Sequence, residues 1–356
     1  MLIKKILFDD FEKIAELNHR NNLTTLQRTD WENLWKKNPY FLINNDWTIG
    51  WKLVDEDKIV GICLNIPFLF ELNKKQILAA VCNNYVIDKK YRTYSLKLRH
   101  LFLNQKNIEL FITNSANKNV EKIMEAFKAK KINQFDYQNR LLFISNKTRV
   151  FYNYLIKLIF NKKKFKKNNL PDNIKGSFQK NNLVFIIKES FDDDFSKLEK
   201  KLNKSELRSS KKLEWLQYKY NKYSRNKDLI IIKIFKDNEF VGYFLIVKVI
   251  EKNYNLKKLS IAEIIVLNDD QQILNETIKF CKDLTKKYNF DLIDVIGYKK
   301  NIRLVLKKQG FFAKKSKNFN FLVKNLNSNL NKDLFSSKEN LNLSLTDGDS
   351  IFYLDQ

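Results

Sequence analysis

The sequence has 356 residues, with 66 Lys and Arg against 40 Asp and Glu, so its formal charge is +26. Its length suits two domains, and a hydrophobic share of 44% excludes general disorder. Seven Gly and three Pro exclude collagen-like and turn-dense all-β architectures. No stretch approaches the ~20 apolar residues of a membrane span, and the first residues lack the order of a signal peptide. We therefore expect a cytoplasmic protein.

The positive charge has two explanations. One is a phosphate-rich partner, such as nucleic acid, an anionic membrane or a nucleotide cofactor. The other is an AT-rich coding bias, because Lys, Asn, Ile, Phe and Tyr dominate the chain. Lys also far exceeds Arg, whereas dedicated readers of phosphates and bases favour the Arg fork. We favour the second explanation and do not expect nucleic acid as a partner.

Familiar catalytic machinery is absent. Two His residues do not supply a zinc site or a Ser-His-Asp triad, and neither common glycine-rich phosphate motif occurs. Cys63, Cys82 and Cys281 lie in apolar runs, which is typical of reduced core thiols. We expect no metal site.

A supersecondary pattern occurs twice, about 180 residues apart. Two apolar runs joined by a polar turn predict a hairpin at 47–66 and another at 229–247. Both second strands open with Val-Gly, at Val60-Gly61 and Val241-Gly242. The spacing is that of a whole domain.

The same elements follow each hairpin. A strand, a helix, a short strand, a helix and a closing strand are expected at 77–87, 92–102, 108–113, 117–129 and 141–145, and again at 259–267, 272–286, 291–296, 301–308 and 319–323. Apolar residues recur at helical spacing in the helices, as at Leu274, Ile278 and Cys281. This order predicts an α/β (α+β) fold with two mixed, mostly antiparallel twisted sheets flanked by helices.

The junction after the strand at 77–87 is the best candidate for ligand binding. The apolar strand runs into a basic turn, Asp88-Lys89-Lys90-Tyr91-Arg92, which opens a helix. Amide groups at a helix start are unpaired and lie at the positive end of the helix dipole, so they suit a diphosphate. An ordinary exposed basic connection is the alternative.

At Val86, Tyr91 and Arg92 the chain resembles the GNAT superfamily of acyl-CoA-dependent acyltransferases, whose fourth strand and next helix are joined by a Val-x-Pro-x-Tyr-Arg-Gly stretch. The order of elements resembles a bacterial tandem-domain member over about 300 residues. The resemblance implies acetyl-CoA or another acyl-CoA as co-substrate. It implies that the backbone near Val86 and Ile87 orients the thioester. It implies cofactor contacts by Arg92, Thr93, Tyr94, Ser95, Leu96 and Lys97, with Asn114 and Asn117 in a second segment.

The chain departs from the family at its glycines. Thr93, Ser95 and Lys97 occupy those positions, and a side chain there raises the steric cost of close approach to phosphate. The Tyr that many members use as an acid maps near Met124, which donates no proton. Tyr94 remains a candidate catalytic residue.

The second half resembles members that carry a Glu base on the fourth strand. Glu263 occupies that position, and an apolar strand is expected to raise its pKa, as a general base requires; a solvent-facing rim residue is the alternative. The acidic segment 268–272 is expected to repel CoA. We therefore expect a degenerate domain there that supplies substrate surface.

We expect an acyl-CoA-binding domain at 1–145, a basic linker with a short apolar helix at 146–180, the degenerate domain at 181–325 and a loosely packed tail at 326–356. The linker is expected to pack on one domain, or alternatively to lie on an anionic membrane.

The hypothesis is acyl transfer, in particular N-acetylation, to a small-molecule or sugar-precursor acceptor. An amino-sugar of cell-surface polysaccharide is implied by analogy with tandem members, and Trp47, Trp51, Trp215, Tyr218 and Tyr220 are candidates for stacking on it. A FemAB-like transferase that uses aminoacyl-tRNA and a scaffold without activity are the alternatives.

Overall fold

The computed structural model describes residues 1–114, 116, 118–132, 139–160, 169–171, 174–202, 205–315, 321–325, 341–344 and 346–355. The chain divides into two compact units. Unit 1 comprises 1–132, 205–210 and 318–341, and unit 2 comprises 133–204, 211–317 and 342–356.

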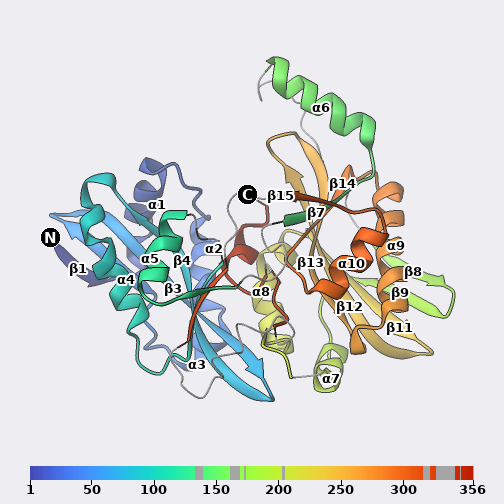
Figure 1. Ribbon diagram of the computed structural model, residues 1–356, viewed down its shortest axis with the longest axis horizontal. Coiled ribbons are helices and arrows are strands. Elements are labelled where there is room, and N and C mark those ends of the chain that lie inside the picture. Colours follow the sequence, from blue (N-terminus) through green and yellow to red (C-terminus); the bar gives the residue numbers. More distant parts are fainter. Residues whose placement is uncertain are drawn as a thin grey trace. The chain divides into compact units, whose positions relative to one another are not determined.

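Unit 1 is built on a sheet with the strand order β1-β2-β3-β4-β5-β16-β6, and β10 also pairs with β3 (Figure 1). Its strands are β1 (Leu2–Lys5), β2 (Gly50–Asp55), β3 (Lys58–Leu72), β4 (Lys75–Ile87), β5 (Leu110–Thr113), β6 (Lys130–Lys131), β10 (Arg208–Ser209) and β16 (Leu322–Asn325). All pairs are antiparallel except β4–β5. The expected hairpin at 47–66 is confirmed as β2–β3.

The helices of this unit are α1 (Phe11–Arg20), α2 (Arg28–Lys36), α3 (Pro39–Ile43), α4 (Ser95–Leu103) and α5 (Lys118–Ala126). In α4 the residues Leu98 and Phe102 are fully buried in a core cluster that also contains Phe111 of β5. Burying such side chains stabilises the unit by roughly 1.5–3 kcal/mol each. The core thereby fixes α4 against the sheet next to the end of β4.

Unit 2 has a second sheet, with the order β15-β7-β14-β13-β12-β11-β9-β8. Its strands are β7 (Asn139–Ile144), β8 (Gly176–Lys180), β9 (Leu183–Lys188), β11 (Leu229–Lys236), β12 (Glu239–Glu251), β13 (Leu256–Val266), β14 (Leu292–Ile296) and β15 (Phe312–Lys315). The pair β13–β14 is parallel, as is β4–β5 in unit 1. The predicted second hairpin is confirmed as β11–β12.

The helices of unit 2 are α6 (Lys147–Phe160), α7 (Asp194–Lys201), α8 (Leu213–Arg225), α9 (Gln271–Lys287) and α10 (Lys300–Lys308). The predicted stripe of α9 is confirmed, because Leu274, Ile278 and Cys281 are fully buried in the core of the unit. No helix in the described ranges is both long and apolar enough to span a bilayer.

The two sheets exchange strands. The expectation that each half of the sequence closes with its own last strand is wrong. β7 pairs with β14 and β15 of unit 2, whereas β16 pairs with β5 and β6 of unit 1. An apolar run predicts a strand, but it does not specify which sheet edge the strand pairs with.

The described part of the tail is not loosely packed. Residues 349–353 form a short 3₁₀ helix in which Ile351 is fully buried. The hydroxyl of Tyr223 on α8 donates a 2.6 Å hydrogen bond to the carbonyl oxygen of Ile351. This segment is therefore part of unit 2.

Candidate functional site

The end of β4 separates from β5. The parallel ladder stops at the pair Val81–Ile112, while β4 continues to Ile87. The register with β3 also shifts between Ile62 and Leu64, so β4 has a bulge, and its residue Asn84 has φ = 46°. A bulge bends and twists a strand, so it turns the last residues of β4 away from β5.

The predicted thioester-orienting residues lie on this segment. Val86 and Ile87 are buried and pair with Ile62 and Gly61 of β3. The amide of Asp88 donates to the carbonyl oxygen of Val60 on β3. Because successive amides of a strand point to opposite edges, the amide of Ile87 points to the edge where β4 has left β5.

The turn after β4 is tied to α1. Arg20 donates to a carboxylate oxygen of Asp88 at 2.9 Å and to the carbonyl oxygen of Ile59 at 2.8 Å. The side-chain amide of Asn21 donates to the other oxygen of Asp88 at 2.7 Å. Both carboxylate oxygens are therefore engaged, and the first residue of the basic turn is held in place.

The predicted single helix at 92–102 is instead two pieces. A 3₁₀ helix spans Lys89–Tyr94, and α4 begins at Ser95. The amide of Ser95 donates to the carbonyl oxygen of Arg92, so that amide is already engaged. Tyr94, at the N-cap of α4, makes no side-chain capping bond. The start of α4 is thus not closed by its own N-cap side chain.

This turn is strongly basic and exposed. Arg92, Thr93 and Lys97 are exposed, and Tyr94 and Ser95 are half-buried. No Asp or Glu occurs from Lys89 to Ile108. The predicted binding residues 92–97 therefore lie together at one positively charged helix start, where an anion is favoured by the helix dipole as well. Asn117 lies outside the described residues.

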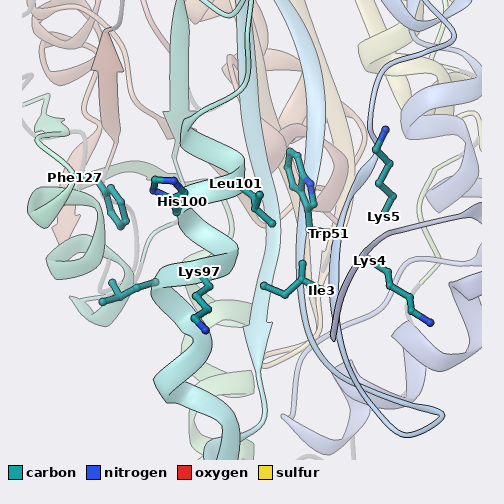
Figure 2. A pocket seen from close by; sticks show the side chains of 9 residues that line it. Ile3, Lys4, Lys5, Trp51, Lys97, His100, Leu101 and Phe127 are labelled. Atoms are coloured by element: carbon teal, nitrogen blue, oxygen red, sulfur yellow. The ribbon is translucent and has the colours of Figure 1, made fainter. Parts of the chain in front are cut away.

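A groove of about 750 Å³ runs along α4 and contains two of these residues, Leu96 and Lys97. In Figure 2, Lys97, His100 and Leu101 project from α4, with Ile3 and Trp51 on the strands to one side and Phe127 on the other. Lys4 and Lys5 also line it, and no lining residue is acidic. A bound anion at the start of α4 would meet an apolar surface with a basic border.

Beneath the helix start lies a buried polar cluster that the sequence analysis missed. Nη1 of Arg99 donates to Sγ of Cys82 at 3.2 Å, and Cζ of Arg99 lies 4.0 Å from the ring centroid of Tyr85. Tyr85 donates its hydroxyl to the carbonyl oxygen of Ser95 at 2.8 Å. One side chain of the β4 bulge therefore holds the first residue of α4.

The thiols of this cluster are unequal. Sγ of Cys63 lies 3.8 Å from Sγ of Cys82, and both are buried. The hydrogen bond from Cys63 and the charge of Arg99 lower the pKa of Cys82 to about 6 despite burial. Burial raises the pKa of Cys63 well above its ordinary value. The sequence signal for this cluster is Arg99 itself, a charge within the buried stripe of α4.

In unit 2, Glu263 is buried rather than at a solvent-facing rim. Its carboxylate accepts bonds from Lys211 at 2.8 Å, Tyr220 at 3.0 Å and Lys219 at 3.3 Å. Burial alone would raise the pKa of Glu263, but the two Lys charges and these bonds outweigh it and lower the pKa to about 2. The expectation of a raised pKa is therefore wrong. Lys211 and Lys219 lie far from Glu263 in sequence, so the pattern around Glu263 did not indicate them.

A carboxylate with a lowered pKa accepts a proton weakly. The catalytic role of Glu263 therefore stays a prediction without support from its surroundings. Nothing in the contacts of Tyr94 assigns it a proton-transfer role either; its ring lies 5.4 Å from Nζ of Lys97.

The helix start of unit 2 that corresponds to α4 is closed by its own residues. The carboxylate of Asp270 accepts from the amides of Gln272 and Ile273 at the start of α9. Lys299 lies 2.7 Å from the carboxylate of the neighbouring Asp269. A second anion there would compete with Asp270, whereas no N-cap side chain engages the start of α4.

The predicted aromatic residues do not form one cluster, and Trp51 alone among them lines the groove along α4. Trp215, Tyr218 and Tyr220 of α8 are buried in unit 2, with at most 4% of each residue exposed. Trp47 and Trp51 pack on the core of unit 1, and Nε1 of Trp47 donates to the carbonyl oxygen of Asn65. Core packing explains four of these aromatic residues, whereas Trp51 both packs on a core and lines the groove.

Comparison with known proteins finds similarity in structure alone. No family model and no curated protein sequence matches the chain. A conserved protein of Enterococcus faecalis V583, described as a probable N-acyltransferase, superposes with a TM-score of 0.58 and 9% identity over 91% of this chain and 72% of its own. Saccharomyces cerevisiae N-myristoyltransferase with bound myristoyl-CoA gives 0.55 and 15% over 91% and 78%.

A GCN5-related N-acetyltransferase of Kribbella flavida gives a TM-score of 0.54 and 10% identity over 91% of this chain and 72% of its own. These matches each span both units. Together with the two mostly antiparallel sheets, they show that the chain has a GNAT-like fold.

Proposed function

We propose that the protein is an acyl-CoA-dependent acyltransferase whose unit 1 binds the CoA diphosphate at the start of α4. The observation that carries the proposal is the coincidence of two features: β4 leaves β5 after Val81, and an exposed basic 3₁₀ turn joins the end of the strand to α4. The first offers an edge for the pantetheine amides and the second a site for the phosphates.

The reaction that fits this geometry is direct transfer. The nitrogen of an amine acceptor attacks the thioester carbon, the carbon–sulfur bond breaks, and CoA leaves as the thiolate, which takes up the proton released by the amine. The amide of Ile87 points to the open edge of β4 and is placed to donate to the developing oxyanion. Holding both reactants in one orientation supplies much of the remaining rate enhancement.

Structures with this fold support the choice of acyl-CoA, since one of them contains myristoyl-CoA. We do not assign a second CoA site to unit 2, because the start of α9 is capped by its own residue Asp270. For the acceptor we propose a primary amine, and an amino-sugar precursor of cell-surface polysaccharide within that class.

The test is calorimetric titration with desulfo-CoA, acetyl-CoA and myristoyl-CoA. We expect binding, and about tenfold weaker affinity in Arg92→Ala and in Lys97→Ala, since each loses a charge-assisted contact to phosphate. Lys106→Ala is the matched control, because Lys106 is exposed on the same unit and removes the same charge.

Activity is then measured with glucosamine-type amines and detection of free CoA thiol. Transfer to an amino-sugar supports the narrower proposal, whereas transfer only to other amines retains the acyltransferase and rejects the sugar. Equal affinity of Arg92→Ala, Lys97→Ala and wild type would reject the assigned site. Binding of tRNA without binding of any CoA would favour the FemAB-like alternative.

A further inference from the structure

Helix α6 presents a row of large apolar side chains to solvent. We call Phe151, Tyr152, Tyr154, Leu155, Leu158 and Ile159 the α6 apolar face. The exposed fraction is 64% for Phe151, 64% for Leu158 and 67% for Ile159. From residue 151, the positions 154, 155, 158 and 159 follow the i+3, i+4, i+7 and i+8 spacing of one helix side. Scattered exposed apolar residues are ordinary, but a continuous helical stripe marks an interaction surface.

The side of α6 that contacts unit 2 combines polar and apolar residues. Val150 and Ile156 are half-buried, and the ring of Tyr154 stacks on that of Tyr254 with 6.2 Å between centroids. Nδ2 of Asn153, which is buried, donates to the carbonyl oxygen of Asn255 at 3.2 Å. Nζ of Lys157 lies 4.0 Å from the ring centroid of Tyr254. A helix on a protein surface ordinarily buries its apolar stripe and exposes its polar side. The linker helix does pack on a domain, as expected, since α6 contacts unit 2 through Asn153 and Lys157. Most of its large apolar side chains, however, lie on the exposed side. Figure 1 shows α6 at the outside of its unit.

The charge of this region selects the partner. The sequence of α6 contains no Asp or Glu, and the following residues 161–169 contain Lys162, Lys163, Lys164, Lys166 and Lys167. An apolar helix side next to a lysine block matches a surface that is apolar inside and negatively charged outside. A protein groove would supply the first property, whereas an anionic lipid leaflet supplies both.

We propose that the α6 apolar face docks on an anionic membrane surface. With 14 residues, α6 is about 21 Å long, which is shorter than a bilayer-spanning helix of ~20 residues. The helix therefore lies along the interface, with its apolar side chains among the acyl chains. The protein becomes a peripheral membrane protein through one helix.

The experiment is co-sedimentation of the full chain with vesicles of phosphatidylcholine and phosphatidylglycerol, compared with vesicles of phosphatidylcholine alone. We expect binding to the anionic vesicles that weakens as salt is added, because salt screens lysine–headgroup attraction. The variant L158E/I159E is expected to lose about tenfold or more of its partition coefficient.

The matched control is L42E/I43E, which changes two exposed apolar residues of α3, with exposed fractions of 67% and 84%, in the same way. The control is expected to bind vesicles as wild type does. Because both pairs are exposed, circular dichroism and the unfolding midpoint should stay unchanged in both variants.

Three results would overturn the proposal. They are no binding to anionic vesicles, equal binding by L158E/I159E and wild type, and a dimer of the free protein in sedimentation velocity that L158E/I159E dissociates. The last would assign the α6 apolar face to a second copy of the chain. None of these results depends on CoA binding, so this proposal and the proposed function fail separately.

Discussion

Nζ of Lys211 lies 2.8 Å from Oε1 of Glu263. Both side chains are buried, with 5% of Lys211 and 2% of Glu263 exposed. Lys211 also lies 3.3 Å from the carboxylate of Asp347 near the end of the chain. The pair therefore connects β13 to residues before α8 and to the C-terminal segment, all within unit 2. Breaking a buried pair leaves an uncompensated charge, which costs far more than the pair contributes.

Glu263→Gln should destabilise the protein by about 3–5 kcal/mol, because Lys211 and Lys219 lose their shared carboxylate. Urea unfolding at neutral pH measures the loss. Glu239→Gln is the control, since Glu239 forms an exposed ion pair with Lys201, and it should change stability by less than about 1 kcal/mol. Equal effects of the two substitutions would contradict the buried network.

The same carboxylate predicts the acid limb of the stability curve. The pKa of Glu263 is about 2 in the folded protein, against an ordinary 4.5. Its contribution is therefore complete above pH 4.5 and is lost as the pH falls towards 2. Between these values the unfolding free energy of wild type should fall more steeply than that of Glu263→Gln. Parallel curves would show that Glu263 titrates normally.

Cys82 should titrate as a thiolate near neutral pH. The hydrogen bond from Cys63 and the charge of Arg99 lower its pKa to about 6, so thiolate absorbance should rise through that pH in the folded protein. Cys82→Ser should abolish this step, and Arg99→Met should move it to higher pH. Cys281→Ser is the control, because burial raises the pKa of Cys281 and it should not contribute.

Asp88→Ala should weaken desulfo-CoA binding by roughly tenfold, since the basic turn loses its ties to Arg20 and Asn21. Calorimetry measures the change. Asp57→Ala, a substitution of an exposed Asp in the β2–β3 turn, should bind as wild type does. If Asp88→Ala binds equally well, the tie does not position the turn.

The two Val-Gly pairs should differ in their tolerance of Ala. A Cβ at Gly242 would lie 2.5 Å from the carbonyl oxygen of Ile265, so backbone must move. A Cβ at Gly61 would lie 3.0 Å from the side chain of Ile87, which is more adaptable. Gly242→Ala should therefore cost about 1–3 kcal/mol or more and Gly61→Ala less, as measured by urea unfolding. The reverse order would contradict this explanation.

Local patterns predicted the hairpins and helices because both depend on neighbouring residues. The stripe at Leu274, Ile278 and Cys281 is an example, since its spacing alone places one helix side in a core. The basic turn after Asp88 was found in the same way, although its split into a 3₁₀ helix and α4 was not.

The missed features depend on residues far apart in sequence. From the sequence alone, Glu263 was interpreted as a carboxylate without charged partners. Lys211 and Lys219 approach it, and Asp347 approaches Lys211, only in the folded chain. The bulge at Asn84 could not be recognised from a glycine in the sequence, because Asn occupies the position with positive φ. The partners of β7 and β16 likewise follow from tertiary packing rather than from either strand's own pattern.

The positions of β7 and β16 in the two sheets constrain the order in which the chain can fold during its synthesis. Unit 1 holds β16 between β5 and β6, and β16 begins at Leu322, after nearly all of unit 2 has been synthesised. Proteins of this size commonly fold domain by domain as they emerge. When synthesis has reached Ser145, the sheet of unit 1 still lacks β16. The strand β7 has then been synthesised before its partners β14 and β15. Neither sheet is therefore complete until residues 312–325, which contain β15 and β16, have been synthesised.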